Sequence, residues 1–170
     1  FMTPDFVKEL VEALERDSQA GFASGKLLRY IPAPSSQKGP VIDSTGLFLD
    51  RRRLARDRGQ GELDRGQYER KEYIFSACGA APMYKREVLE DVAPDGEVFD
   101  ESSVAFLEDA DLGWRAQLRG WKCLYVPSAI AYHVRGGFGD LRGKGGKPAA
   151  LPPKIARASR IHQLKNRYLM

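Results

Sequence analysis

The chain has 170 residues, of which 42% are hydrophobic and 10% aromatic, enough for one compact domain with a buried core. No apolar run reaches the length that crosses a bilayer, and residues 1–20 lack the order of a signal peptide. The net charge is +4, but the segments 51–71 and 135–170 are basic, which leaves an acidic remainder suited to a metal or a general base.

The first elements alternate between helical and extended patterns. Apolar residues at helical spacing predict a helix over about 4–16, with Thr3 as its capping residue and Pro4 at its first position. After a glycine, residues 21–30 read as a strand. A second strand is expected at 41–50, broken by a glycine in its middle.

The middle of the chain contains a long polar excursion followed by the clearest helix. Residues 51–71 have no sustained apolar period, and we expect a mobile, basic loop of the kind that often covers an active site. A buried strand is predicted at 73–77 and a helix at about 85–92. The strongest helical pattern covers 108–119 and ends at Gly120, a residue suited to a left-handed cap.

Two short strands, 122–126 and 129–134, are expected on either side of Pro127. The remaining residues, 136–170, are rich in glycine and lysine and read as a basic linker and tail. Alternating strands and helices over 1–135 predict an α/β or α+β layered domain.

Three acidic residues fall in the first turn of the helix at 108–119. Glu108, Asp109 and Asp111 lie where exposed backbone N–H groups and the helix dipole favour an ionised carboxylate. Such a carboxylate can take a proton from an attacking hydroxyl group. Asp111 and Arg115 are four residues apart and are expected to form a supporting ion pair. Acidic first turns are also common as simple helix caps, and the pattern alone leaves both interpretations open.

The surrounding residues add information because of their order. That order is Gly79-Ala80-Ala81, Tyr84-Lys85-Arg86, Phe99-Asp100-Glu101, Glu108-Asp109-Ala110-Asp111-Leu112, Arg115, Gly120-Trp121, Tyr125-Val126-Pro127 and Tyr132-His133. In this order, residues 76–134 resemble family 2 glycosyltransferases of the GT-A fold, in particular bacterial rhamnosyltransferase-like enzymes that build surface polysaccharides and lipid-linked glycans. The likeness extends back through Asp43-Ser44-Thr45-Gly46 and Thr3-Pro4-Asp5-Phe6, and so covers most of 1–135.

The resemblance implies a role for each matching residue. Asp109 would be the general base that deprotonates the acceptor hydroxyl, and Glu108 would position the acceptor or the base. Gly79, Ala80 and Ala81 would form a small-residue floor under the donor sugar. His133 resembles a late histidine that completes the coordination of a divalent metal, Mg²⁺ or Mn²⁺, in some members.

Other residues have two interpretations that the sequence leaves open. Trp114 suits either core packing or contact with a sugar. Arg135 suits either the donor diphosphate or an ordinary surface charge. Asp111 is placed in the substrate site by the resemblance and in a supporting contact by its spacing. His133 and the turn at Gly79 can equally be structural.

The resemblance predicts an inverting hexosyltransferase-type enzyme that transfers a sugar from a nucleotide-sugar donor to a glycan or lipid-linked acceptor. The nucleotide-binding strands and the Asp-x-Asp motif that the family places before the first helix are not in the sequence. We therefore expect a partial three-layer GT-A domain, weakly active or inactive alone, that can self-associate through the edge left by the missing strands.

Cysteine usage indicates a cytoplasmic protein, because Cys78 and Cys123 lack the spacing of a metal or redox motif. Peripheral contact with an anionic membrane at the inner face of the plasma membrane is expected from the basic segments. The alternative is a non-catalytic module that binds glycans or anionic lipids. A metal-dependent phosphoesterase is disfavoured because the chain has only two histidines, and nucleic-acid binding because its basic runs lack interleaved aromatics.

Overall fold

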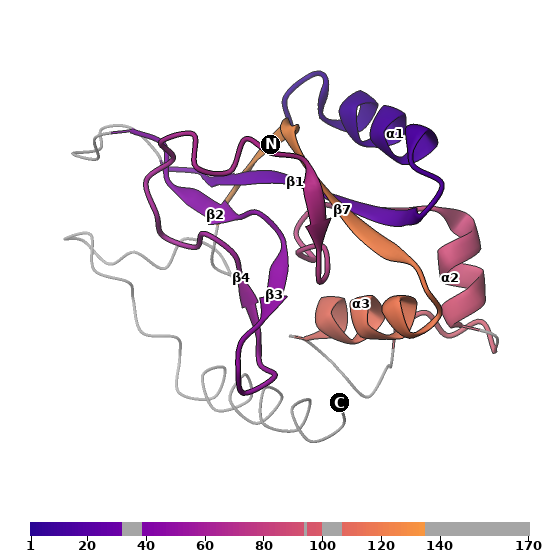
Figure 1. Cartoon of the computed structure of the whole chain (residues 1–170). Helices are drawn as coiled ribbons and strands as arrows, with labels where there is room; N and C mark the ends of the chain where they lie inside the picture. Colours follow the sequence, from indigo (N-terminus) through magenta and orange to yellow (C-terminus); the bar gives the residue numbers. More distant parts are fainter. Residues whose placement is uncertain (32–38, 94, 100–106, 135–170) are drawn as a thin grey trace.

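A computed structural model describes residues 1–31, 39–93, 95–99 and 107–134 of the chain (Figure 1). Arg135, Asp100, Glu101 and the tail 136–170 lie outside the described residues. The described helices are α1 (Phe6–Arg16), α2 (Arg86–Val92) and α3 (Glu108–Leu118). The strands are β1 (Ala20–Arg29), β2 (Ile42–Ser44), β3 (Leu47–Leu49), β4 (Ala55–Asp57), β5 (Glu72–Ile74), β6 (Pro82–Tyr84) and β7 (Lys122–His133).

The main sheet is mixed and is built around two long strands. β1 pairs in parallel with β7 from Ala20 to Arg29, and β5 pairs antiparallel to the outer edge of β7. The opposite edge of β1 is shared, because β6 pairs antiparallel with its first half and β2 with its last residues. β3 and β4 form a separate antiparallel hairpin, which a bridge from Leu47 to Ser76 joins to the segment after β5. The fold is therefore a mixed α/β domain.

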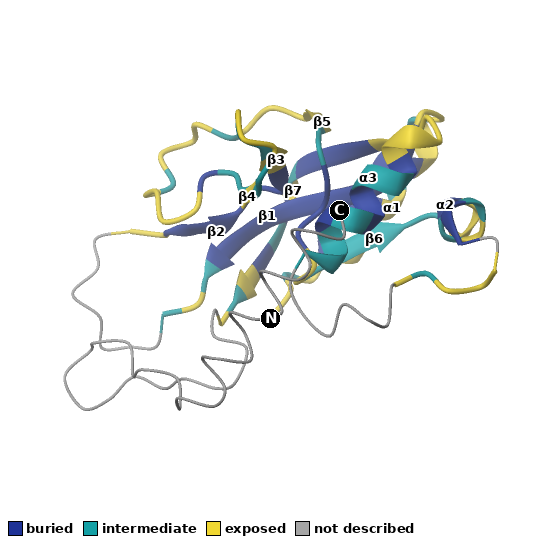
Figure 2. Ribbon diagram, turned by 90° about the horizontal axis from the view of Figure 1, so that it is seen from below, coloured by how far each residue is buried: buried dark blue, intermediate teal, exposed yellow. Residues whose placement is uncertain are grey.

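Helices cover both faces of this sheet, as the two ribbon views show (Figures 1 and 2). Alternation along a strand sends successive side chains to opposite faces. Ala23 and Leu27 of β1 pack with α1, which buries Phe6 and Leu10. On the other face, Phe22 packs with side chains of α2 and α3. α3 is thus fixed by its apolar side, and its first turn is left beside the end of the segment that follows β5.

Several predicted elements are confirmed and some boundaries are corrected. The three helices occur where the sequence indicates them, and Gly120 ends α3 with a φ of 90°. The strand expected at 73–77 is shorter and partly exposed. Thr3 does not cap α1: its hydroxyl donates instead to the carbonyl oxygen of Ile130, 2.8 Å away, and the helix begins at Phe6.

The prediction of two strands on either side of Pro127 is wrong, because β7 is one strand of 12 residues. Its pairing with β1 shifts register between Gly25 and Lys26, where Val126 and Ile130 are the successive partners. Proline donates no ladder hydrogen bond and is tolerated at such an irregularity. The strand therefore passes through the proline, and His133 stays paired at its end.

Residues 51–71 make specific contacts in the structure. β4 forms within this segment, and Lys26, buried in β1, bonds the carboxylates of Asp64 and Glu69. The Arg58 guanidinium lies 4.8 Å from the ring centres of both Tyr68 and Tyr125. A backbone hydrogen bond between Ile42 and Glu62 joins the segment to β2 as well. The segment is thus anchored to the sheet by side chains and by backbone, and its mobility stays a prediction. In the part of the chain that the structure describes, no helix has the length and apolarity to span a membrane.

Candidate active site

The first turn of α3 is held against the segment that follows β5 by a close backbone approach. Gly113 faces Ser76, and a methyl group at Gly113 would lie 2.1 Å from the Ser76 hydroxyl oxygen. The same hydroxyl donates a hydrogen bond of 2.7 Å to the Asp109 carbonyl oxygen. Directly before the helix, Leu107 adopts a φ of 71°, a conformation that is uncommon for a residue with a side chain and is often found at functional sites.

This arrangement brings Asp109 to the Gly79 turn. The Gly79 N–H donates to Asp109 Oδ2 over 2.9 Å, and the Ala110 N–H donates to Asp109 Oδ1 over 2.9 Å. Each carboxylate oxygen thus has one backbone donor and keeps acceptor capacity. The Asp109 side chain is half-buried, whereas Gly79 and Ala80 are exposed and Ala81 is partly so. The carboxylate therefore lies under a turn of small residues that is open to solvent.

The environment of Asp109 changes its acidity. Burial raises the pKa of Asp109 from 3.8 to about 6, the hydrogen bond from Gly79 acts in the opposite direction, and the charge of Glu108 adds to the rise. A carboxyl group with a pKa of about 6 is mostly ionised at neutral pH and is a stronger proton acceptor than an ordinary aspartate. The geometry therefore supplies a fixed base near neutral pH.

Glu108 lies beside the same turn. A side chain carbon at Gly79 would be 3.5 Å from Glu108 Oε1 and 3.3 Å from Asp109 Oδ2, so both carboxylates converge on this glycine. Glu108 Oε2 is buried and has no hydrogen-bond partner among the described residues. An unsatisfied carboxylate oxygen can accept a hydrogen bond from a ligand hydroxyl group.

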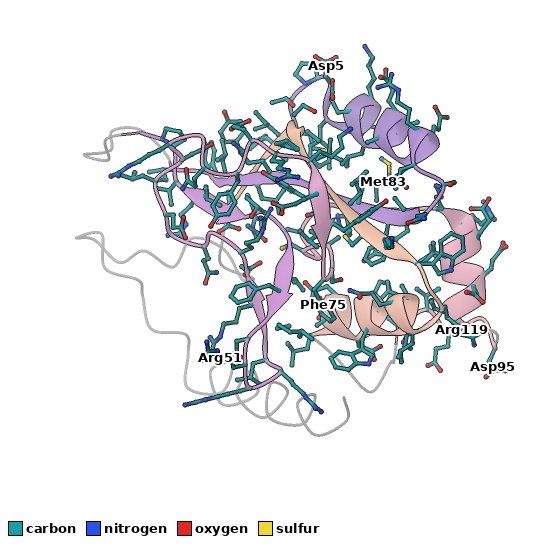
Figure 3. All side chains as sticks on the ribbon, in the orientation of Figure 1. Asp5, Arg51, Phe75, Met83, Asp95 and Arg119 are labelled. Carbon is teal, nitrogen blue, oxygen red and sulfur yellow. The ribbon has the colours of Figure 1, made fainter. Side chains whose placement is uncertain are left out.

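Two other predicted site residues have supporting contacts. Asp111 forms the expected ion pair with Arg115, with Oδ2 2.8 Å from Nη2. Arg115 also donates to the carbonyl oxygens of Val92 and Val98, so the pair ties α3 to the end of α2. Trp114 packs edge-on against Phe75 with ring centres 5.8 Å apart, and Figure 3 shows Phe75 beside α3. These contacts agree with the supporting role of Asp111 and the packing role of Trp114.

The resemblance implies that His133 binds a divalent metal, and in the structure its side chain contacts the carboxylate of Asp43. His133 Nδ1 lies 2.7 Å from Oδ2 of Asp43, which is fully buried. A neutral imidazole that donates from Nδ1 to a carboxylate presents the lone pair of Nε2, the usual arrangement of a metal-ligating histidine. Among the described residues, however, no group of three or more His, Cys, Asp or Glu side chains is placed to hold a metal. The hydrogen bonds of Asp109 run to the Gly79 turn and to its own helix, whereas His133 bonds Asp43 at the end of β7.

Sequence reasoning gave no role to two acidic residues, Asp57 and Asp43. Asp57 pairs with Leu47 across the β3–β4 hairpin, and Leu47 in turn bridges to Ser76. The hairpin therefore lies next to Ser76, whose hydroxyl bonds the backbone of Asp109. The charge of Asp57 contributes to the raised pKa of Asp109. Asp43 enters the sequence argument only as part of a motif. It is the middle residue of β2, and its partner could be known only from the fold.

No model of a known protein family matches the chain, and no curated protein matches it either.

Proposed function

We propose that these residues form the acceptor-side part of an inverting glycosyltransferase of the GT-A type, with Asp109 as the general base. The observation that supports this most is the position of the Asp109 carboxylate: at the first turn of α3, under the Gly79 turn, with a pKa raised to about 6. The donor is a nucleotide sugar, and the acceptor is a glycan or a lipid-linked glycan.

The proposed reaction is a single displacement. An acceptor hydroxyl oxygen attacks the anomeric carbon of the donor sugar while Asp109 takes its proton, and the bond from that carbon to the diphosphate oxygen breaks. The nucleoside diphosphate leaves with the electron pair. Attack from the face opposite the leaving group inverts the anomeric configuration. Glu108 accepts a hydrogen bond from the acceptor through its buried Oε2.

The described residues do not complete a site for Mg²⁺ or Mn²⁺. His133 fits as a single ligand through Nε2, because Asp43 holds the other ring nitrogen. Since the residues described supply no group of three potential ligands, the proposed reaction includes no step at a metal.

The test is sugar transfer by the full-length protein carrying Asp109→Asn. The amide oxygen keeps an acceptor for the Gly79 N–H, so the fold should survive while the proton acceptor is lost. A positioned general base typically contributes about a hundredfold or more to the rate, and we expect a loss of that size. Asp111→Asn is the control, because Asp111 pairs with Arg115 and should affect stability more than transfer. Retained turnover in Asp109→Asn rejects the assignment.

The same experiment distinguishes the proposed glycosyltransferase from the alternative, a non-catalytic binding module. A binding module would bind glycans or vesicles of anionic lipid equally well in the wild-type protein and in the Asp109→Asn variant. In that case the unmodified full-length protein would also transfer no sugar from any nucleotide-sugar donor.

A further inference from the structure

A cleft lies at the ends of β1 and β7, and none of its lining residues belongs to the Gly79 turn. Its volume is about 450 Å³, within the range of sites that bind small molecules. Its walls include the aromatic residues Phe1, Tyr30 and Tyr132, together with Arg29. Figure 2 shows the N-terminus beside the arrowheads of the strands, and backbone hydrogen bonds join Phe1 to Tyr132.

The two tyrosines of the cleft are partly exposed. Tyr30 is 37% exposed and Tyr132 is 41% exposed, and the Phe1 and Tyr30 rings lie 5.2 Å apart. Neither phenol hydroxyl makes a hydrogen bond within the described ranges. Aromatic faces suit the apolar C–H faces of a sugar ring, and the phenol hydroxyls can donate to or accept from its hydroxyl groups.

Arg29 supplies the charge of the cleft. Its Nε is buried and forms an ion pair with Asp43 Oδ1 over 3.7 Å, but it makes no hydrogen bond in the described part of the chain. Asp43 instead bonds His133 at 2.7 Å. The guanidinium group thus keeps donors that the described protein atoms do not use. A planar guanidinium pairs best with a carboxylate or a phosphate, because two of its N–H groups match two ligand oxygens.

We infer that this cleft binds a sugar that carries an acidic group, with the ring against the tyrosines and the acid on Arg29. The acid is a carboxylate, as in a uronic acid, or a phosphate, as in a sugar phosphate. The inference does not depend on the role of Asp109, since the lining residues share none with the Gly79 turn. It adds a recognition site for an anionic glycan beside His133.

The test is to titrate the full-length protein with candidate ligands and to measure binding by calorimetry or by amide chemical shifts in NMR. The ligands are glucuronate, glucose phosphate, neutral glucose and inorganic phosphate. We expect glucuronate or glucose phosphate to bind most tightly, and the tighter of the two identifies the acidic group. Glucose binding as tightly as both, inorganic phosphate matching the sugar phosphate, or no binding of either acidic sugar would each overturn the inference.

Variants locate the binding in the cleft. Arg29→Gln should lower the affinity for the acidic sugar about tenfold or more, because it removes a charge-assisted hydrogen bond. The matched control is Arg56→Gln, which removes an exposed arginine of β4 that is paired with Asp50. Arg29→Gln also removes the ion-pair partner of buried Asp43 and can therefore affect folding. Tyr132→Ala provides a second test at an exposed position. Its control is Tyr73→Ala, at another exposed tyrosine. Unchanged affinity in folded Arg29→Gln or in Tyr132→Ala rejects the site.

Discussion

The hydroxyl of Ser76 donates a hydrogen bond to the backbone carbonyl oxygen of Asp109 at 2.7 Å. This bond joins the segment after β5 to the first turn of α3. It is possible because Gly113, one turn further along the helix, has no side chain to separate the two backbones. The carboxylate of Asp109 is therefore positioned by this backbone contact as well as by the hydrogen bonds that its side chain accepts from Gly79 and Ala110.

Gly113→Ala should destabilise the protein, although the same change in an exposed helix usually stabilises it by about 0.5–1 kcal/mol. The new methyl group would lie 2.1 Å from the Ser76 hydroxyl oxygen and 2.4 Å from its Cβ. Overpacking of this kind costs about 1–3 kcal/mol of unfolding free energy, measurable by urea denaturation. A Ser76→Gly background removes both clashing atoms, so the loss should be much smaller there. Equal losses in the two backgrounds would contradict the contact.

The stability of the wild-type protein should depend on pH through Asp109. Its pKa is 3.8 unfolded and about 6 folded, so the folded state holds this proton more tightly. The stabilisation that the bound proton gives to the folded state is fully present below about pH 4, and it is lost as the pH rises through about 6. Because the side chain is only partly buried, we expect a loss of about 1–2 kcal/mol relative to Asp109→Asn, measured by denaturation across this range. Parallel pH profiles for the two proteins would refute the raised pKa.

Glu108→Gln should lower the pKa of Asp109 towards its ordinary value, since the charge of Glu108 adds to the rise. The measurement is the titration of the Asp109 carboxyl carbon by NMR. If Asp109 is the base, the rate of sugar transfer should follow the same shift towards lower pH. Asp111→Asn is the control, because its carboxylate is paired with Arg115. An equal shift in both variants would show that the effect is not specific to Glu108.

Lys26→Met should loosen the segment 58–69, although its backbone hydrogen bonds to Ile42 remain. Lys26 is 2% exposed and bonds Asp64 at 3.0 Å and also Glu69, so its loss leaves two carboxylates without their cation. Since Glu69 is exposed, we expect a cost of about 1–3 kcal/mol rather than that of a fully buried pair. Proteolysis and amide exchange should both become faster within this segment. Lys8→Met, at an exposed helix pair with Glu12, should change neither.

Local patterns were sufficient for α3 and its carboxylates. The acidic first turn, the pair of Asp111 with Arg115 and the stop at Gly120 all depend on residues a few positions apart, and all three are present. The contact of Asp109 with Gly79 spans 30 residues, and no local pattern connects the two positions. The chemistry assigned to them stays a prediction.

Long-range pairing explains what the sequence did not reveal. Pro127 predicted a break in β7, but parallel pairing with β1 continues on both sides of a register shift. The partner of His133 is Asp43, 90 residues earlier in the chain, and no local signal connects them. The excursion at 51–71 appeared solvated because its anchors, Lys26 and Tyr125, belong to other strands.

β1 is bonded along both edges, with β7 on one side and β6 and β2 on the other. A strand in this position cannot open without breaking the sheet, so its amide protons should exchange with solvent only through global unfolding. The Gly79 turn precedes β6, and the aromatic cleft lies at the last residue of β1. Thermal fluctuations that admit a ligand to either place can therefore occur in the surrounding turns while the scaffold between them stays intact.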